Sequence, residues 1–186
     1  MKINPDSVFR KEIEKESVQN VNLCYQCTKC TAGCPMAEEM DYSPTQIVHA
    51  IRLGLKDKVI NSKTIWVCAS CETCTTRCPQ GVDIAKLMDS VRHLAIKEGI
   101  VVPDEVKEIP LFYRIALKNI RRFGRMYEVG MITSLKLATG EYFKDLRLGY
   151  RMGLKGKFKI LPERTRSAKE VKKIFEKALE IEGKKL

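Results

Sequence analysis

This sequence of 186 residues contains only two histidines, and no cysteine lies outside two short segments. Histidine and cysteine supply many of the acid–base groups and nucleophiles of enzymes, so few residues remain for catalysis. The chain also contains no Gly-x-Gly-x-x-Gly or Walker sequence, and no nucleotide or flavin site is predicted. We therefore expect no substrate site in this chain.

Long apolar runs and strand signals are also missing. No apolar run approaches the roughly 20 residues that a membrane helix needs. The polar opening, Met1 to Asp6, contains no apolar segment that would direct export. Val101 and Val102 precede Pro103, and no alternating run of useful length appears elsewhere. We expect an all-α protein without a membrane span, located in the cytoplasm, where thiols stay reduced.

The eight cysteines fall in two copies of one spacing, and each copy ends in Cys-Pro. This is the spacing of bacterial proteins that hold two 4Fe–4S clusters, in which the fourth cysteine of each run ligates the other cluster. Pro35 and Pro79 fix the backbone after the fourth cysteine of their runs. We predict two 4Fe–4S clusters, cluster 1 on Cys24, Cys27, Cys30 and Cys78, and cluster 2 on Cys68, Cys71, Cys74 and Cys34.

Two other interpretations of the cysteines have to be weighed. An even count fits a secreted disulfide framework, but the polar N-terminal segment does not favour export. Structural zinc is the better alternative, because Cys-x-x-Cys pairs are common zinc ligands. Zinc sites use two pairs, however, rather than triplets followed by Cys-Pro. Assays for iron and acid-labile sulfide distinguish these interpretations.

The net charge of +11 is concentrated in the second half of the chain. Residues 1–106 hold 13 Lys and Arg against 14 Asp and Glu, whereas residues 107–186 hold 21 against 9. Such a basic region could bind an acidic protein face, an anionic membrane or nucleic acid. A solvated helical surface rich in lysine is at least as good an interpretation of most of these charges.

Helical patterns follow each cysteine run. Ser43 and Pro44 predict a helix start. Apolar residues at helical spacing follow, with Gly54 as a C-terminal stop or a kink; they are Ile47, Val48, Ile51 and Leu55. A short helix is expected over 55–60. Asp83 predicts another cap, followed by an apolar face that ends at Gly99 and consists of Ile84, Leu87, Met88, Val91 and Ala95. The runs with their helices form an internal repeat with an offset of 44 residues.

The second half predicts helices that glycines interrupt. One begins at Pro110, others are expected over 125–138 and 141–154, and a last helix begins after the Ser167-x-x-Glu170 capping box. We divide the chain into an N-terminal helical segment (1–20), an α-helical ferredoxin module with two 4Fe–4S clusters (21–103) and a basic helical extension for partner docking (104–186).

Three residues near the runs have two interpretations each. His49 and His93 lie in the helices that follow the runs, where either could hydrogen-bond to a cluster or be an ordinary, partly buried helix residue. Trp66 stands two residues before Cys68, and it could shield that cluster from water or simply pack in the core. With eight cysteine ligands for two clusters, no open iron is expected, so the chain is predicted to relay electrons rather than to catalyse.

The residues around the cysteines resemble a known family. Asn22 to Pro35 (NLCYQCTKCTAGCP) and Trp66 to Pro79 (WVCASCETCTTRCP) look like HdrC, an iron–sulfur subunit of the CoB–CoM heterodisulfide reductase of methanogenic archaea. The likeness is strong over roughly residues 20–100, and beyond them it extends only to length and basic helical character. Thr28 departs from the family, which often has glycine there.

This resemblance implies an electron-transfer subunit of an oxidoreductase complex that serves methanogenesis. Such a subunit takes electrons from the flavin-bearing subunit HdrA and passes them to the catalytic subunit HdrB, which reduces the CoM-S-S-CoB heterodisulfide. The heterodisulfide reductase subunits HdrA and HdrB are thus the expected partners, with room for a hydrogenase or dehydrogenase that feeds HdrA.

Three other functions compete with this interpretation. A relay subunit of another disulfide, sulfur or organic-acid oxidoreductase is the main alternative, because a relay module does not encode the final substrate. Iron–sulfur subunits of succinate or fumarate enzymes carry an added 2Fe–2S domain, for which this chain has no cysteines. Nucleic-acid binding is favoured only by the basic region and is not expected.

Overall fold

The computed structural model describes residues 6–140, 147, 151, 154–155, 165 and 167–181. These residues form helices, turns and loops, and none of them lies in a strand, which confirms the all-α prediction for this part of the chain. No helix among them is long and apolar enough to cross a membrane. The chain divides into two compact units, Met1–Lys107 and Glu108–Leu186.

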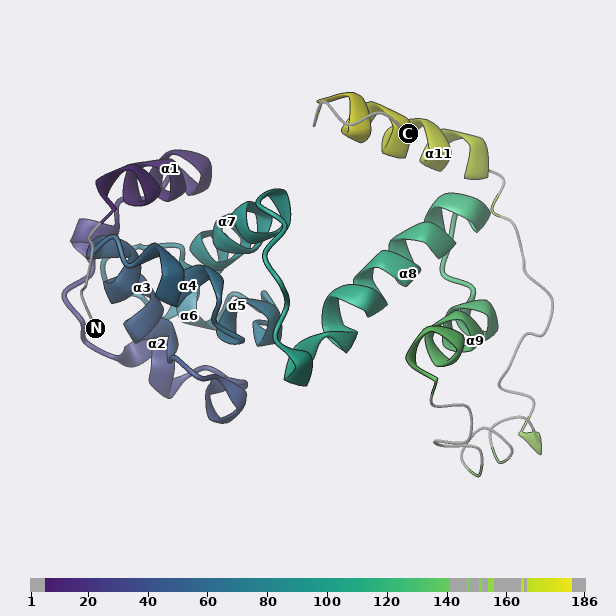
Figure 1. Ribbon diagram of the computed structural model, residues 1–186, viewed down its shortest axis with the longest axis horizontal. Coiled ribbons are helices and arrows are strands. Elements are labelled where there is room, and N and C mark those ends of the chain that lie inside the picture. Colours follow the sequence, from purple (N-terminus) through teal and green to yellow (C-terminus); the bar gives the residue numbers. More distant parts are fainter. Residues whose placement is uncertain are drawn as a thin grey trace. The chain divides into compact units, whose positions relative to one another are not determined.

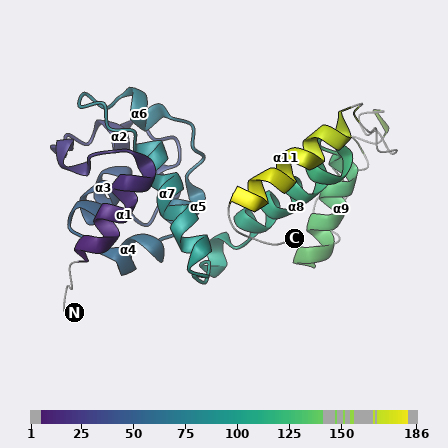
Figure 2. The same ribbon diagram turned by 90° about the horizontal axis from the view of Figure 1, so that it is seen from above.

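The first unit contains seven described α-helices and three short 3-10 helices. The α-helices are α1 (Ser7–Ser17), α2 (Lys29–Ala32), α3 (Pro44–Arg52), α4 (Lys56–Ile60), α5 (Thr64–Val67), α6 (Thr73–Thr76) and α7 (Ile84–Lys97). The 3-10 helices are η1 (Val21–Leu23), η2 (Ala37–Glu39) and η3 (Asp104–Val106). Helix α7 contacts α1, α3, α4, α5 and α6, and Figures 1 and 2 show α1 beside it.

The core of this unit is built from the apolar faces of α1, α3 and α7. Phe9 and Ile13 of α1 are fully buried. The predicted faces of α3 and α7 are buried as well, through Ile47, Val48 and Ile51 in the first and Ile84, Leu87, Met88, Val91 and Ala95 in the second. Each large side chain buried in this way contributes about 1.5–3 kcal/mol. This core fixes the helices from which the cysteine runs extend.

The predicted helix starts in this unit are confirmed. Ser43 caps α3 in a capping box with Gln46, Pro44 occupies the first turn, and the Asp83 side chain accepts the Lys86 N–H at the start of α7. Helix α3 ends at Arg52, earlier than the pattern with Leu55 suggests, because Gly54 turns the chain with a φ of 69°. The sequence pattern did not predict α5.

In the second unit, α8 (Glu108–Phe123) contacts both α9 (Glu128–Thr139) and α11 (Ala168–Ile181). The turn between α8 and α9 is held by Asn119, whose Oδ1 accepts the Tyr127 N–H at 2.7 Å and whose Nδ2 donates to the Tyr127 carbonyl at 3.3 Å. Helix α8 begins two residues before the predicted start at Pro110. The helix expected over 141–154 lies largely outside the described residues.

Candidate iron–sulfur centre

Two cavities in the first unit each collect cysteines from both runs. Cys24, Cys27 and Cys30 line the first cavity together with Cys78 of the other run; we call it the Cys24 cavity. Cys68, Cys71 and Cys74 line the second together with Cys34, and we call it the Cys68 cavity. The structure thus brings the eight predicted residues together in two groups of four, each with three cysteines from one run and one from the other.

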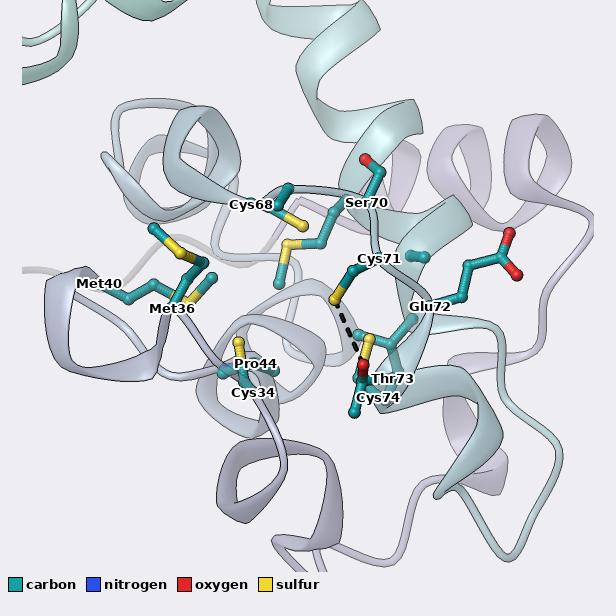
Figure 3. A pocket seen from close by; sticks show the side chains of 14 residues that line it. Cys34, Met36, Met40, Pro44, Cys68, Ser70, Cys71, Glu72, Thr73 and Cys74 are labelled. Atoms are coloured by element: carbon teal, nitrogen blue, oxygen red, sulfur yellow. Dashed lines mark hydrogen bonds between the residues drawn. The ribbon is translucent and has the colours of Figure 1, made fainter.

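Figure 3 shows how the side chains of the Cys68 cavity lie. The sulfur atoms of Cys34, Cys68, Cys71 and Cys74 point into one shared space, and Met36 and Met40 line it on one side. The empty space measures about 380 Å³ here and about 340 Å³ in the Cys24 cavity, part of it open to solvent. Four thiols around one space are the soft donor set that iron–sulfur clusters take. The residues present therefore fit such a cluster in each cavity.

Both runs follow the same backbone path around their middle cysteine. Gln26 and Thr28 flank Cys27 with φ of 62° and 63°, and the equivalent Ser70 and Glu72 have φ of 48° and 59°. This left-handed conformation costs a non-glycine residue about 1–2 kcal/mol. It also explains why glycine suits the position of Thr28. Strain of this kind persists where the surrounding structure fixes a loop for a site.

The two runs meet where α2 contacts α6. Gly33 precedes Cys34, and Arg77 precedes Cys78 at the equivalent position of the repeat. A Cβ atom at Gly33 would overlap Cδ of Arg77 and would lie 2.6 Å from its Nε and 2.8 Å from its Cζ. The Arg77 side chain therefore occupies the space that a side chain at position 33 would need.

Threonines join each run to the helix that follows it. Thr31 Oγ1 accepts the N–H of Thr45 at 3.2 Å, and Thr75 Oγ1 accepts the N–H of Ala85 at 3.3 Å. Thr31 and Thr75 are 44 residues apart, whereas Thr45 and Ala85 are 40 residues apart. The sequence predicted a single offset of 44 residues for the repeat. The structure shows that the cysteine runs are 44 residues apart and the helices after them 40, because the connection after the first run is four residues longer.

Arginines of the following helices reach the first cysteine of each run. Arg52 of α3 donates from Nη1 to the Cys24 carbonyl at 2.9 Å, and Arg92 of α7 donates from Nη2 to the Cys68 carbonyl at 2.8 Å. Sequence reasoning missed both residues. Their separation of 40 residues, the same as that of the helix caps Ser43 and Asp83, is the signal that could have identified them.

The cysteine thiols have different acidities. Burial raises the pKa of Cys34, and the nearby Cys68 and Cys71 raise it further. A hydrogen bond with the backbone of Met36 lowers this pKa, but by less than burial raises it. Burial also raises the pKa of Cys74, to about 11. Hydrogen bonds from the side chain and backbone of Thr73 lower the pKa of the exposed Cys71. Because metal ligands must be thiolates, binding of a metal cluster by these cysteines would release protons.

The two histidines have partners other than the cysteines, and Trp66 is buried outside the Cys68 cavity. His49 Nδ1 lies 2.9 Å from Nη2 of Arg52, and His93 Nδ1 lies 2.5 Å from Oε1 of Glu16 in α1. Trp66 is only 3% exposed, does not line the Cys68 cavity, and has a buried Nε1 without a hydrogen-bond partner. Core packing is thus the role that the structure supports for Trp66.

Comparison with known proteins shows what the cysteine-containing segment is similar to. The family model of the 4Fe-4S dicluster domain matches residues 23–83, which include all eight cysteines. This part of the chain is therefore similar to ferredoxin-type 4Fe-4S domains.

Curated relatives are named as HdrC subunits of heterodisulfide reductases. The chain is 40% identical over 105 residues to the iron–sulfur subunit HdrC of the CoB–CoM heterodisulfide reductase of Methanopyrus kandleri, covering 52% of this chain and 54% of the relative. It is 34% identical over 100 residues to the corresponding subunit of the H2:CoB-CoM heterodisulfide, ferredoxin reductase of Methanothermobacter marburgensis, covering 54% of each. The resemblance predicted from the cysteine runs is confirmed. The chain spans about half the length of these relatives.

Proposed function

We propose that this chain, a relative of the heterodisulfide reductase subunit HdrC, is an electron-transfer subunit that holds two 4Fe–4S clusters with crossed fourth ligands. Cys24, Cys27, Cys30 and Cys78 hold one cluster, and Cys68, Cys71, Cys74 and Cys34 hold the other. The observation that carries this proposal is the arrangement of the eight cysteines in two cavities, each with three cysteines from one run and one from the other.

The clusters supply one-electron transfer when they are bound, and the protein residues set the conditions for it. With four cysteines in each cavity, each iron of a bound cluster would have a cysteine ligand, and none would be left for a substrate. Hydrogen bonds to sulfur support the thiolates: Gln26 Nε2 donates to Cys24 Sγ at 3.2 Å, and Thr45 Oγ1 lies 3.1 Å from Cys30 Sγ. Such contacts to the sulfurs tune cluster potentials.

The crossed ligation is tested with serine variants of the reconstituted full chain. Iron and sulfide analysis of the unaltered protein is expected to give two complete clusters. We expect Cys34→Ser to change the same EPR signal as Cys68→Ser, and Cys78→Ser to change the same signal as Cys24→Ser. If Cys34→Ser and Cys24→Ser change one signal, the crossed assignment is wrong.

We further propose that the chain passes electrons from the flavin-bearing subunit HdrA to the catalytic subunit HdrB in the cytoplasm. The similarity to HdrC relatives supports this placement. The basic second unit is the candidate docking surface, because it is rich in positive charge and because Phe112, Tyr113 and Leu117 of α8 are partly exposed. Isolation from the native cell is expected to recover both subunits. Recovery with the active-site subunit of a different oxidoreductase would point to the alternative relay function.

The docking role of the second unit has its own test. A chain that lacks residues 107–186 is expected to keep both clusters but to lose its partners. The control is the iron content of the truncated chain, since loss of the clusters would make failed assembly uninformative. Full assembly of the complex without residues 107–186 contradicts the docking role.

A further inference from the structure

The two arginines that reach the cysteine runs occupy equivalent places in the repeat. Each lies in the helix after its run, each is partly buried, and each donates a short hydrogen bond to the carbonyl oxygen of the first cysteine. Arg92 also donates from Nε to the Ile65 carbonyl at 2.8 Å. A guanidinium group offers several donors in a rigid fork, so these contacts fix the start of each run relative to its helix.

The arginines differ in the residue that lies three positions before them. Asp89 Oδ1 accepts from Arg92 Nη1 at 3.0 Å and also from Ser70 Oγ at 2.9 Å. Arg52 has His49 at this place, with Nη2 2.9 Å from His49 Nδ1. A guanidinium group only donates, and an imidazole, unlike a carboxylate, carries no negative charge. A carboxylate therefore offsets the charge of Arg92, but the charge of Arg52 has no such neighbour in His49.

Other charged residues of the two runs act in the same direction. The first run contains Lys29 and no acidic residue. Arg77 precedes Cys78 of the Cys24 cavity, but its side chain lies against Gly33, which precedes Cys34 of the Cys68 cavity, so its charge is assigned to neither cavity. Glu72 lines the Cys68 cavity. Lys29, Arg77 and Glu72 are exposed, so water screens their charges more than those of the partly buried arginines. The Cys24 cavity thus lies in the more positive surroundings.

We propose that Arg52 and Arg92 are positioning residues for the two cysteine runs, and that their unequal neighbours give the cluster of the Cys24 cavity the higher midpoint potential. Positive charge favours the reduced cluster, which carries one more electron, and net charge is one of the quantities that set these potentials. Electrons that enter the chain therefore settle preferentially at the Cys24 cavity. This inference rests on the proposed function, because it needs both clusters to be present.

The test is a redox titration of the reconstituted full chain, monitored by EPR. The variants are Arg52→Gln, Arg52→Lys, Arg92→Gln and Asp89→Asn. Arg10→Gln is the matched control, because it removes a charge from α1, which lines neither cavity and in which Arg10 pairs with Glu14. Iron analysis of the unaltered chain comes first: fewer than two clusters would contradict the proposed function rather than this inference.

The expected shifts differ in sign and in the cluster affected. Arg52→Gln lowers the higher of the two midpoint potentials. Arg52→Lys keeps the positive charge but not the planar guanidinium group, and its midpoint potential stays close to that of the unaltered chain. Arg92→Gln lowers the other midpoint, whereas Asp89→Asn raises it. Arg10→Gln leaves both unchanged.

Several results would overturn the inference. One is that Arg52→Gln shifts the lower midpoint potential. Another is that both arginine variants shift the same midpoint potential. A third is that variants that keep their iron show shifts no larger than those of Arg10→Gln. If the glutamine variants lose iron, Asp89→Asn decides the electrostatic part alone, because both arginine contacts to cysteine carbonyls remain possible in it. An unchanged or lowered midpoint in Asp89→Asn overturns it.

Discussion

The contact between Gly33 and Arg77 allows a prediction in which one substitution has opposite effects in two backgrounds. Alanine at Gly33 places a Cβ atom against Cδ, Nε and Cζ of Arg77. Overpacking of this kind costs about 1–3 kcal/mol, and the exposure of Arg77 lets its side chain move, so we expect a cost near the lower end. For a unit of 107 residues, about 1 kcal/mol corresponds to a fall in melting temperature of roughly 4–8 °C.

The sign reverses when Arg77 is replaced by alanine. Gly33 has φ of −103° and ψ of −3°, a conformation that alanine adopts without strain. Replacing glycine at such a position stabilises a protein by about 0.4–1 kcal/mol, because the unfolded chain loses freedom. Gly33→Ala is therefore expected to lower the melting temperature when residue 77 is arginine, and to raise it by a few degrees in the Arg77→Ala background.

The assay is anaerobic thermal unfolding of the four proteins of this cycle, followed by far-UV circular dichroism and visible absorbance. A single scan rate is used throughout, because unfolding with cluster loss is irreversible. Iron content is matched before comparison. If Gly33→Ala has the same effect in both backgrounds, Arg77 does not occupy the space beside Gly33, and the reasoning is refuted.

Three further predictions concern single residues of the first unit. Thr28→Gly should stabilise the holoprotein by about 1 kcal/mol, because glycine adopts the left-handed conformation freely; equal stabilisation by Thr28→Ala in the same melting assay would contradict this. Trp66→Phe should change stability by less than about 1 kcal/mol, since loss of ring volume is offset by removal of an unpaired buried N–H, whereas Trp66→Ala should cost about 3–5 kcal/mol. Asp41→Asn should destabilise the protein by about 1–2 kcal/mol at neutral pH. Although burial opposes it, hydrogen bonds from Thr64 and the Lys63 and Tyr42 backbone hold the Asp41 pKa below its usual value. The stabilisation is therefore present above about pH 4 and lost as pH falls, and a variant whose deficit persists in acid would refute it.

The sequence predicts the helices of the first unit best where a cap and an apolar face coincide. Ser43 with Pro44 and Asp83 mark helix starts through local hydrogen bonds, which depend on neighbours in the chain. Helix α5 has no such cap, and its four residues, Thr64–Val67, are all buried, so no periodic face reveals it. For α3 the sequence marks the end through Gly54, and the structure adds a distant contact there, in which the Gly54 carbonyl accepts the Asp6 N–H at 2.8 Å.

The sequence alone determined the chemistry of the site, because eight cysteines at this spacing are the ligand set that iron–sulfur clusters take. Tertiary structure decided how they are grouped in space, because α2 and α6 must come together before Cys34 and Cys78 reach the cavities of the opposite runs. It also brought Arg52 and Arg92 to the carbonyls of Cys24 and Cys68, across 28 and 24 residues. The physical reason is that cysteine spacing is a local property of a loop, whereas an arginine charge acts on a site only where the packing of helices places it.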